Sequence, residues 1–259
     1  MDQKLSFKKL LTLTAVFVVA DLICEQILVF NAVNWAFYQF HLTQFEASFI
    51  AKMVALVFVL ILNALITKQK IFVKPHFSWQ ETIYWVFIVL LTIPFTGAAN
   101  IQNASLTGLM GGTEEFFARG VILGIFLTYL LQKGYSRKAM IQGMVYSNII
   151  FGLMHMTNIT HVPVSAALAQ SVVAMFGGLA YTVLYIQTGS IWAAFAMHAF
   201  EDLMLTVIDH LNEVNETIPQ LMNVANALFG YFKIILVIFV LFYWKKHEPA
   251  LSRKIRGAK

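Results

Sequence analysis

The chain has 259 residues, of which 59% are hydrophobic and only 12% are charged, and its mean hydropathy is +0.72. A soluble domain carries roughly 25% charged residues, so this composition excludes a soluble globular protein and a disordered one. The class that remains is an all-α polytopic membrane protein, in which each helical span needs ~20 apolar residues.

Eight apolar segments, each long enough to span a membrane as a helix, follow one another along the chain. They use most of the sequence, so we expect a single membrane-embedded domain over residues 1–259. The formal net charge is +5, but the basic residues sit in short loops, which favours a role in membrane orientation and no nucleic-acid partner. The predicted spans are residues 10–31, 46–67, 79–96, 114–132, 139–156, 164–186, 190–208 and 221–244.

The basic residues alternate from one loop to the next. All Lys and Arg residues except Lys52, Arg119 and Lys233 lie at the N-terminus, in the loops after the second and fourth spans, or in the C-terminal tail. Short loops rich in Lys and Arg stay in the cytoplasm. We therefore predict a multi-pass protein of the cell membrane with both termini in the cytoplasm.

Ionisable side chains inside a span are costly and mark functional sites by default. Asp21 and Glu25 share one face of the first span and are interpreted as an interior polar patch. Lys52 in the second span is expected to extend its ammonium outward to the membrane surface. Lys233 in the last span needs a carboxylate partner, which the sequence does not identify.

The densest polar group is expected to open the fourth span. Residues 98–113 are polar and rich in glycine, so we expect them to lead from the outside into a helix that begins at Glu114. Glu115 and Arg119 are four residues apart and can form an ion pair on one helix face, whereas Glu114 points about 100° away and is free for another task. Near a helix N-terminus the helix dipole would favour both carboxylates. A capping cluster with a structural ion pair is the alternative.

Two later spans contribute histidine. His155 ends the fifth span on the same predicted outer side, and His198 lies within the seventh span, one turn before Asp202. The connection at 188–189 is so short that the sixth and seventh spans should be antiparallel neighbours. Two Glu, two His, an Asp and an Arg are thus expected to meet in the outer half of the membrane. A hydrogen-bonded structural cluster or a proton relay would have the same composition.

The order of these motifs resembles that of the CAAX protease and bacteriocin-processing family, the Abi group of intramembrane endopeptidases related to the type II CAAX prenyl endopeptidase. The resemblance covers residues 114–202, about a third of the chain. One departure is small, because Asp202 stands where the family has Asn or Asp. The matching motifs are Glu114-Glu115-xxx-Arg119-Gly120, Phe151-xxx-His155-xx-Asn158, Gly189-Ser190-Ile191-Trp192 and His198-xxx-Asp202.

The resemblance implies a role for each matching residue. Glu114 and His155 would activate a water molecule for attack on a peptide carbonyl. His198 and Asp202 would hold or polarise the oxyanion. The implied supporting residues are Glu115, Arg119 and Asn158.

A metal mechanism is the rival interpretation. Glu114, His155 and His198 could furnish three zinc ligands and leave a fourth position for water. However, these ligands would come from three separate spans, and the chain has no His-Glu-xx-His helix. We therefore favour the glutamate-activated water and no cofactor.

The expected partners are the lipid bilayer and a peptide or small membrane protein that is cleaved within or beside the membrane. A second hypothesis is a bacteriocin self-immunity protein that acts with or without proteolysis. A third is a proton-coupled transporter in which the same carboxylates relay protons. The first three spans and the eighth carry no motif and are expected to control substrate access.

Overall fold

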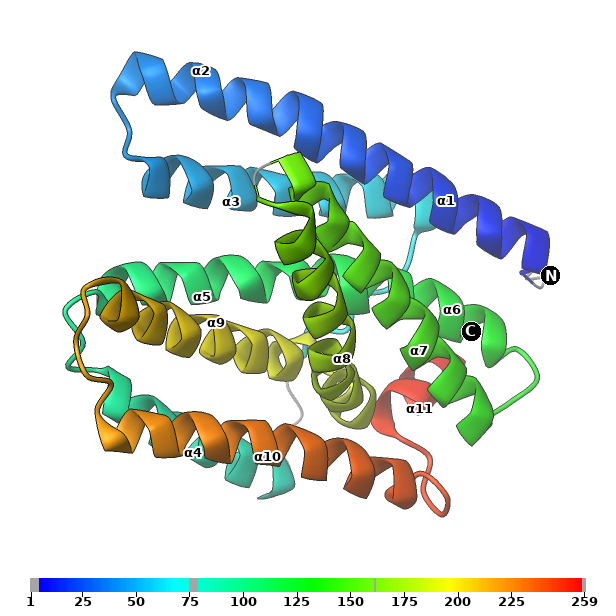
Figure 1. The fold of residues 1–259 in the computed structure, drawn as a ribbon. Helices are drawn as coiled ribbons and strands as arrows, with labels where there is room; N and C mark the ends of the chain where they lie inside the picture. The colour runs from blue at the N-terminus through cyan, green and yellow to red at the C-terminus, as the bar shows by residue number, and fades with distance from the viewer. Residues whose placement is uncertain (1–4, 75–78, 161, 258–259) are drawn as a thin grey trace.

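The computed structural model describes residues 5–74, 79–160 and 162–257. Throughout these residues the regular secondary structure is helical (Figure 1), which confirms the predicted all-α class. Within the described part, five helices are long and apolar enough to cross a membrane; the count of eight spans stays a prediction. These five are Phe7–Phe40, Phe45–Thr67, Val164–Thr188, Ile191–Glu213 and Gln220–Tyr243.

The first two predicted spans form a long helical hairpin (Figure 1). α1 (Phe7–Ile23), the π-helical segment η1 (Cys24–Val29) and α2 (Phe30–Phe40) follow one another without a break, so the first span is longer at both ends than predicted. The chain returns through α3 (Gln44–Leu62) and η2 (Asn63–Thr67). Thr43 and Glu46 form a capping box that starts α3.

The fourth predicted span begins earlier than expected. After α4 (Trp79–Thr92) and η3 (Ile93–Phe95), the chain enters α5 (Ile101–Glu115), which continues through η4 (Phe116–Leu123) into α6 (Gly124–Leu130). Residues 101–113 are therefore helical, and Glu114 lies near the middle of a continuous helix. The expectation that the helix dipole favours Glu114 and Glu115 at an N-terminus is wrong.

The next two helices lie across the others. α7 (Arg137–Met154), η5 (His155–Thr160) and α8 (Val164–Thr188) cross the direction that α5, α9 (Ile191–Glu213) and α10 (Gln220–Tyr243) share in Figure 1. The tight connection to α9 forms at Gly189, whose φ of +62° suits glycine. α8 and α9 are neighbours, as predicted, but in Figure 1 they diverge from this glycine at an angle and do not run antiparallel side by side.

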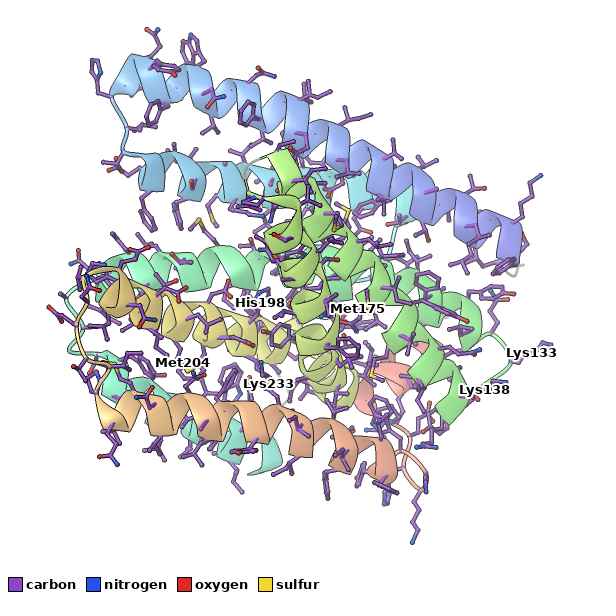
Figure 2. All side chains as sticks on the ribbon, viewed as in Figure 1. Lys133, Lys138, Met175, His198, Met204 and Lys233 are labelled. Atoms are coloured by element: carbon purple, nitrogen blue, oxygen red, sulfur yellow. The ribbon has the colours of Figure 1, made fainter. Side chains whose placement is uncertain are left out.

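The start of α1 and the end of α10 lie at the same end of the molecule (Figure 1). Lys133 and Lys138 lie at this end too (Figure 2). A short helix that the sequence analysis did not predict, α11 (Ala250–Gly257), packs here against α8. Its Lys254 Nζ donates a hydrogen bond to the Gly189 carbonyl at 2.7 Å, which ties the C-terminal segment to the α8–α9 turn.

Large apolar side chains cover much of the outer surface of the helices. Leu65 on η2, Phe176 on α8 and Phe239 on α10 are each at least 64% exposed, and they have many apolar neighbours. Soluble monomers rarely expose contiguous apolar surface of this kind. These faces suit lipid tails, so the fold is that of a multi-pass membrane protein.

Candidate active site

The site depends on an unusually close approach of α5 and α9. A Cβ added at Gly108 would overlap the backbone of Ala199, and one added at Gly111 would overlap the carboxylate of Asp202. Small residues allow helix backbones to approach closely in membranes. Because of its glycines, the segment 98–113 was expected to be a loop. In the structure these glycines let α5 pack closely against α9, which brings Glu115 against His198.

Glu115 is completely buried at the centre of this packing surface. Its Oε1 accepts a hydrogen bond from Arg119 Nη1 at 3.0 Å and another from His198 Nδ1 at 2.8 Å. The predicted ion pair between Glu115 and Arg119 is therefore present. Because the same oxygen also holds the His198 ring, this pair fixes the orientation of a histidine from a different helix.

Arg119 joins four segments of the chain. Its Nε donates to Thr182 Oγ1 at 3.1 Å, and its Nη2 donates to Asn148 Oδ1 at 2.9 Å and to the Gly178 carbonyl at 2.8 Å. The guanidinium also lies over the Phe151 ring, 4.4 Å from its centroid. The buried charge is therefore well satisfied, and it anchors η4 to α5, α7 and α8.

His198 is held on three sides. Nδ1–H points to Glu115, the Tyr181 ring stacks on the imidazole at 4.7 Å, and Nε2 lies 3.7 Å from Asp202 Oδ2. The spacing of His198 and Asp202 thus brings them together on one helix face, as predicted. With Nδ1 occupied by a carboxylate, Nε2 is the ring atom available to a substrate.

The side chain of Glu114 faces away from the buried network of Glu115, Arg119 and His198, and it has polar partners of its own. Its Oε1 accepts a hydrogen bond from Lys52 Nζ at 3.0 Å, and its Oε2 lies 3.8 Å from His155 Nε2. Lys52 also donates to Glu25 Oε1 at 3.3 Å. The expectation that Lys52 extends outward is wrong, because two carboxylates inside the bundle stabilise its ammonium.

The backbone fixes the role of each nitrogen of His155. Nδ1 lies 2.9 Å from the Phe151 carbonyl, and a carbonyl oxygen can only accept, so Nδ1 carries a proton. In the neutral ring Nε2 is then an acceptor that faces Glu114.

Two neighbouring cavities meet at Glu114. One has a volume of about 310 Å³ and contains His155, and the other has a volume of about 460 Å³ and contains Asp202. Glu25, Lys52, Glu114 and Asn158 line both. The side chain of Asn158 also donates to Gln170 Oε1 at 2.8 Å, so it lies at the wall of the cavities rather than in the buried network.

The site lies inside the helical bundle. Glu114 is near the middle of the continuous helix from α5 to α6, and Figure 2 shows His198 well inside the molecule. The expected placement in the outer half of the membrane, which depended on the loop charges, stays a prediction.

Several neighbours of the site were missed by the sequence analysis. Asn148 and Thr182 are polar residues inside apolar spans, the same signal that pointed to the charged residues, but they carry no charge. Gly178 is a further neighbour, since a Cβ there would overlap Arg119. The contact of Lys52 with Glu114 crosses 62 residues of sequence, and no spacing rule predicts it.

The alternative metal ligands do not form a preassembled metal site. Within the described ranges, no group of three His, Cys, Asp or Glu side chains is arranged to hold a metal ion. Glu114 Oε1 is also bonded to the ammonium of Lys52, a cation that a metal ion would have to displace. The donor set of Glu114, His155 and His198 is therefore not assembled for zinc as it stands.

Comparison with known families gives a match over part of the chain. Residues 78–204 match the family model described as type II CAAX prenyl endopeptidase Rce1-like. The match includes the motif residues from Glu114 to Asp202 and leaves out Glu25 and Lys52. It confirms the resemblance that the motifs indicated. Searches of curated proteins and of solved structures found no significant match.

Proposed function

The chain carries an Rce1-like intramembrane protease domain over residues 78–204, and we propose that it hydrolyses a peptide bond with a water molecule activated by Glu114 and His155. The observation that carries this proposal is the pairing of Glu114 Oε2 with His155 Nε2 across 3.8 Å at the edge of a polar cavity.

These two atoms are suited to hold a nucleophilic water. An ionised carboxylate oxygen accepts hydrogen bonds, and so does Nε2 of a histidine whose Nδ1 carries the proton. The two atoms are 3.8 Å apart, close enough for one water molecule beside them to bond both. A water molecule can donate one hydrogen to each from ordinary hydrogen-bond distance, which leaves an oxygen lone pair for the substrate.

The reaction then follows general-base chemistry. The water oxygen bonds to the peptide carbonyl carbon while Glu114 takes the water proton, and a tetrahedral oxyanion forms. When the carbon–nitrogen bond breaks, the same proton passes to the leaving nitrogen. The products are a carboxylic acid and an amine, and Glu114 returns to its ionised form.

His198 is the proposed oxyanion donor. Glu115 holds Nδ1, so with both nitrogens protonated the Nε2–H can donate to the developing negative charge. Asp202 at 3.7 Å from Nε2 orients the ring. Arg119 and Glu115 support this arrangement from the buried side, and removing one such oxyanion donor commonly lowers kcat by about 100- to 1000-fold.

The proposed substrate is a peptide or small membrane protein that is cleaved within or beside the membrane. The matching family is described as a CAAX prenyl endopeptidase. We propose a location in the cell membrane with both termini cytoplasmic, so that the substrate end enters from the basic face. No cofactor is required in this proposal.

The proposal is tested with purified protein in detergent and two probes, a farnesylated peptide ending in a CAAX sequence and the same peptide without the prenyl group. Mass spectrometry should detect two fragments of at least one probe, with the chelator 1,10-phenanthroline causing no loss. His155→Gln should lower kcat by about 100-fold or more. Loss of cleavage with chelator and recovery with zinc would contradict the metal-free mechanism.

The same variant separates the other two hypotheses. A bacteriocin-immunity scaffold without proteolysis would protect cells equally well with His155→Gln and would generate no peptide fragments. A proton-coupled transporter would give pH-driven substrate flux in liposomes without new peptide termini. Either result, together with uncleaved probes, would contradict an endopeptidase.

A further inference from the structure

Lys52 reaches the site from outside the matched family domain. It lies on α3, before residues 78–204, and its ammonium contacts Glu114 at 3.0 Å and Glu25 at 3.3 Å. About a third of its side chain is exposed, and it lines both cavities beside Glu114. The N-terminal hairpin therefore supplies a group to the centre of the site.

The two oxygens of Glu114 have different partners because of Lys52. In the part of the chain that the structure describes, the hydrogen bond to the Glu114 side chain comes from Lys52 and goes to Oε1. The last torsion of a glutamate side chain has a broad energy minimum, so a free carboxylate would rotate. With Oε1 held by the ammonium, Oε2 is the oxygen that faces His155.

The Lys52 ammonium lies among several negative charges, so an uncharged side chain there would leave them without a cation. Four carboxylates line the two cavities, those of Asp21, Glu25, Glu114 and Asp202. Lys52 lies between two of them and separates two like charges. Glu25 contacts Lys52 from η1, so the hydrogen bonds that link it to Glu114 run through the lysine.

From this geometry we propose that Lys52 is a positioning residue for the general base: it orients the Glu114 carboxylate toward His155, and Glu25 holds Lys52 in place. The proposal rests on the proposed peptidase function and extends it. The helical hairpin of α1, α2 and α3 then completes the active site, in addition to the substrate access expected of it.

The test measures kcat and KM of Lys52→Met, Lys52→Arg and the double variant Lys52→Met/Glu25→Gln on the peptide probe that the wild-type protein cleaves. Misplacing a catalytic group by about 1 Å can cost 100-fold in rate. We expect Lys52→Met to lower kcat about 10- to 100-fold with KM within about threefold. Lys52→Arg should recover most of the rate, because its guanidinium can contact both carboxylates.

Lys52→Met alone leaves two carboxylates without their cation and can fail to fold for that reason. The double variant removes the lysine and one of the two carboxylates together, so it leaves fewer unpaired charges. It should fold and remain as slow as Lys52→Met. Arg256→Met is the control: it also removes a cation from an ion pair, but its partner is Glu248, and neither residue lines the two cavities. This variant should keep wild-type kcat.

The outcomes separate the two proposals. A folded Lys52→Met or double variant with wild-type kcat overturns the role of Lys52 and leaves the peptidase intact. An equal loss in Arg256→Met also overturns it, because removing any cation from an ion pair would then matter equally. A wild-type protein that cleaves neither probe contradicts the peptidase and the Lys52 proposal with it.

In the wild type, a zero-length carbodiimide should link Lys52 to Glu114 or Glu25, and absence of this link contradicts the geometry itself.

Discussion

Arg119 shows how much of the site is decided by single residues. It is 1% exposed and donates to Glu115, Asn148, Thr182 and the Gly178 carbonyl. Its ion pair with Glu115 follows from a four-residue spacing, so the sequence analysis predicted it. Its contacts with Asn148 and Thr182 come from other helices, and uncharged polar residues in a span give a weaker signal than charges do.

Replacing Arg119 tests this arrangement. Arg119→Met leaves Glu115 buried without its cation, and breaking a buried pair in this way costs about 3–5 kcal/mol. The free energy of unfolding, measured by denaturant titration in detergent, should fall by that amount. Arg119→Lys should recover little, because one ammonium cannot reproduce the planar set of donors.

The matched control is Arg256→Met, which removes an arginine of α11 from its exposed ion pair with Glu248. Exposed pairs contribute about 0–1 kcal/mol, so this variant should unfold like the wild type. An Arg119→Met protein within 1 kcal/mol of the wild type would show that the buried pair does not hold the site together.

At the scale of elements, the glycines of α5 explain why the predicted start of the fourth span was wrong. Gly108, Gly111 and Gly112 lower the helix propensity of α5, so the sequence indicated a loop. Packing against α9 outweighs this propensity, and no single-sequence rule reveals which neighbour a glycine face will meet. The helix start was therefore missed, and with it the position of Glu114 near the middle of a continuous helix.

The glycine pair on α8 gives an element-scale prediction. A Cβ at Gly178 would overlap Arg119 Nη2 and Asn148 Oδ1, whereas a Cβ at Gly177 has no atom within 4 Å. Gly178→Ala should lower the free energy of unfolding by about 1–3 kcal/mol through overpacking and should reduce cleavage. Gly177→Ala, the neighbouring control, should leave both unchanged in the same titration and cleavage assay. Equal behaviour of the two variants would contradict the proposed contact of α8 with Arg119.

At the scale of the whole molecule, composition was sufficient to predict a helical multi-pass membrane protein. Long apolar segments and few charges leave no other fold class. The crossing of α7 and α8 over the other helices was not predictable, because crossing angles depend on side-chain packing between elements and not on hydropathy. The single domain over residues 1–259 stays a prediction.

The predicted topology can be tested with single cysteines. In a Cys24→Ser background, Lys133→Cys lies in the basic turn after α6, and Glu216→Cys lies in the connection between α9 and α10 at the other end of the molecule (Figure 1). In intact cells a membrane-impermeant maleimide should label position 216 and not position 133. After permeabilisation both should react. The reverse pattern in intact cells would contradict cytoplasmic termini.

The account as a whole depends on Glu114 as the base that activates water, and one measurement tests this most directly. Wild-type protein and Glu114→Gln, matched for folding by their thermal unfolding curves, are incubated with the same cleavable peptide in H₂¹⁸O. We expect the wild type to give two fragments with ¹⁸O in the new carboxyl terminus, and Glu114→Gln to be slower by at least about 100-fold, because an amide cannot take the proton. A folded Glu114→Gln protein that cleaves the peptide at the wild-type rate would contradict the mechanism.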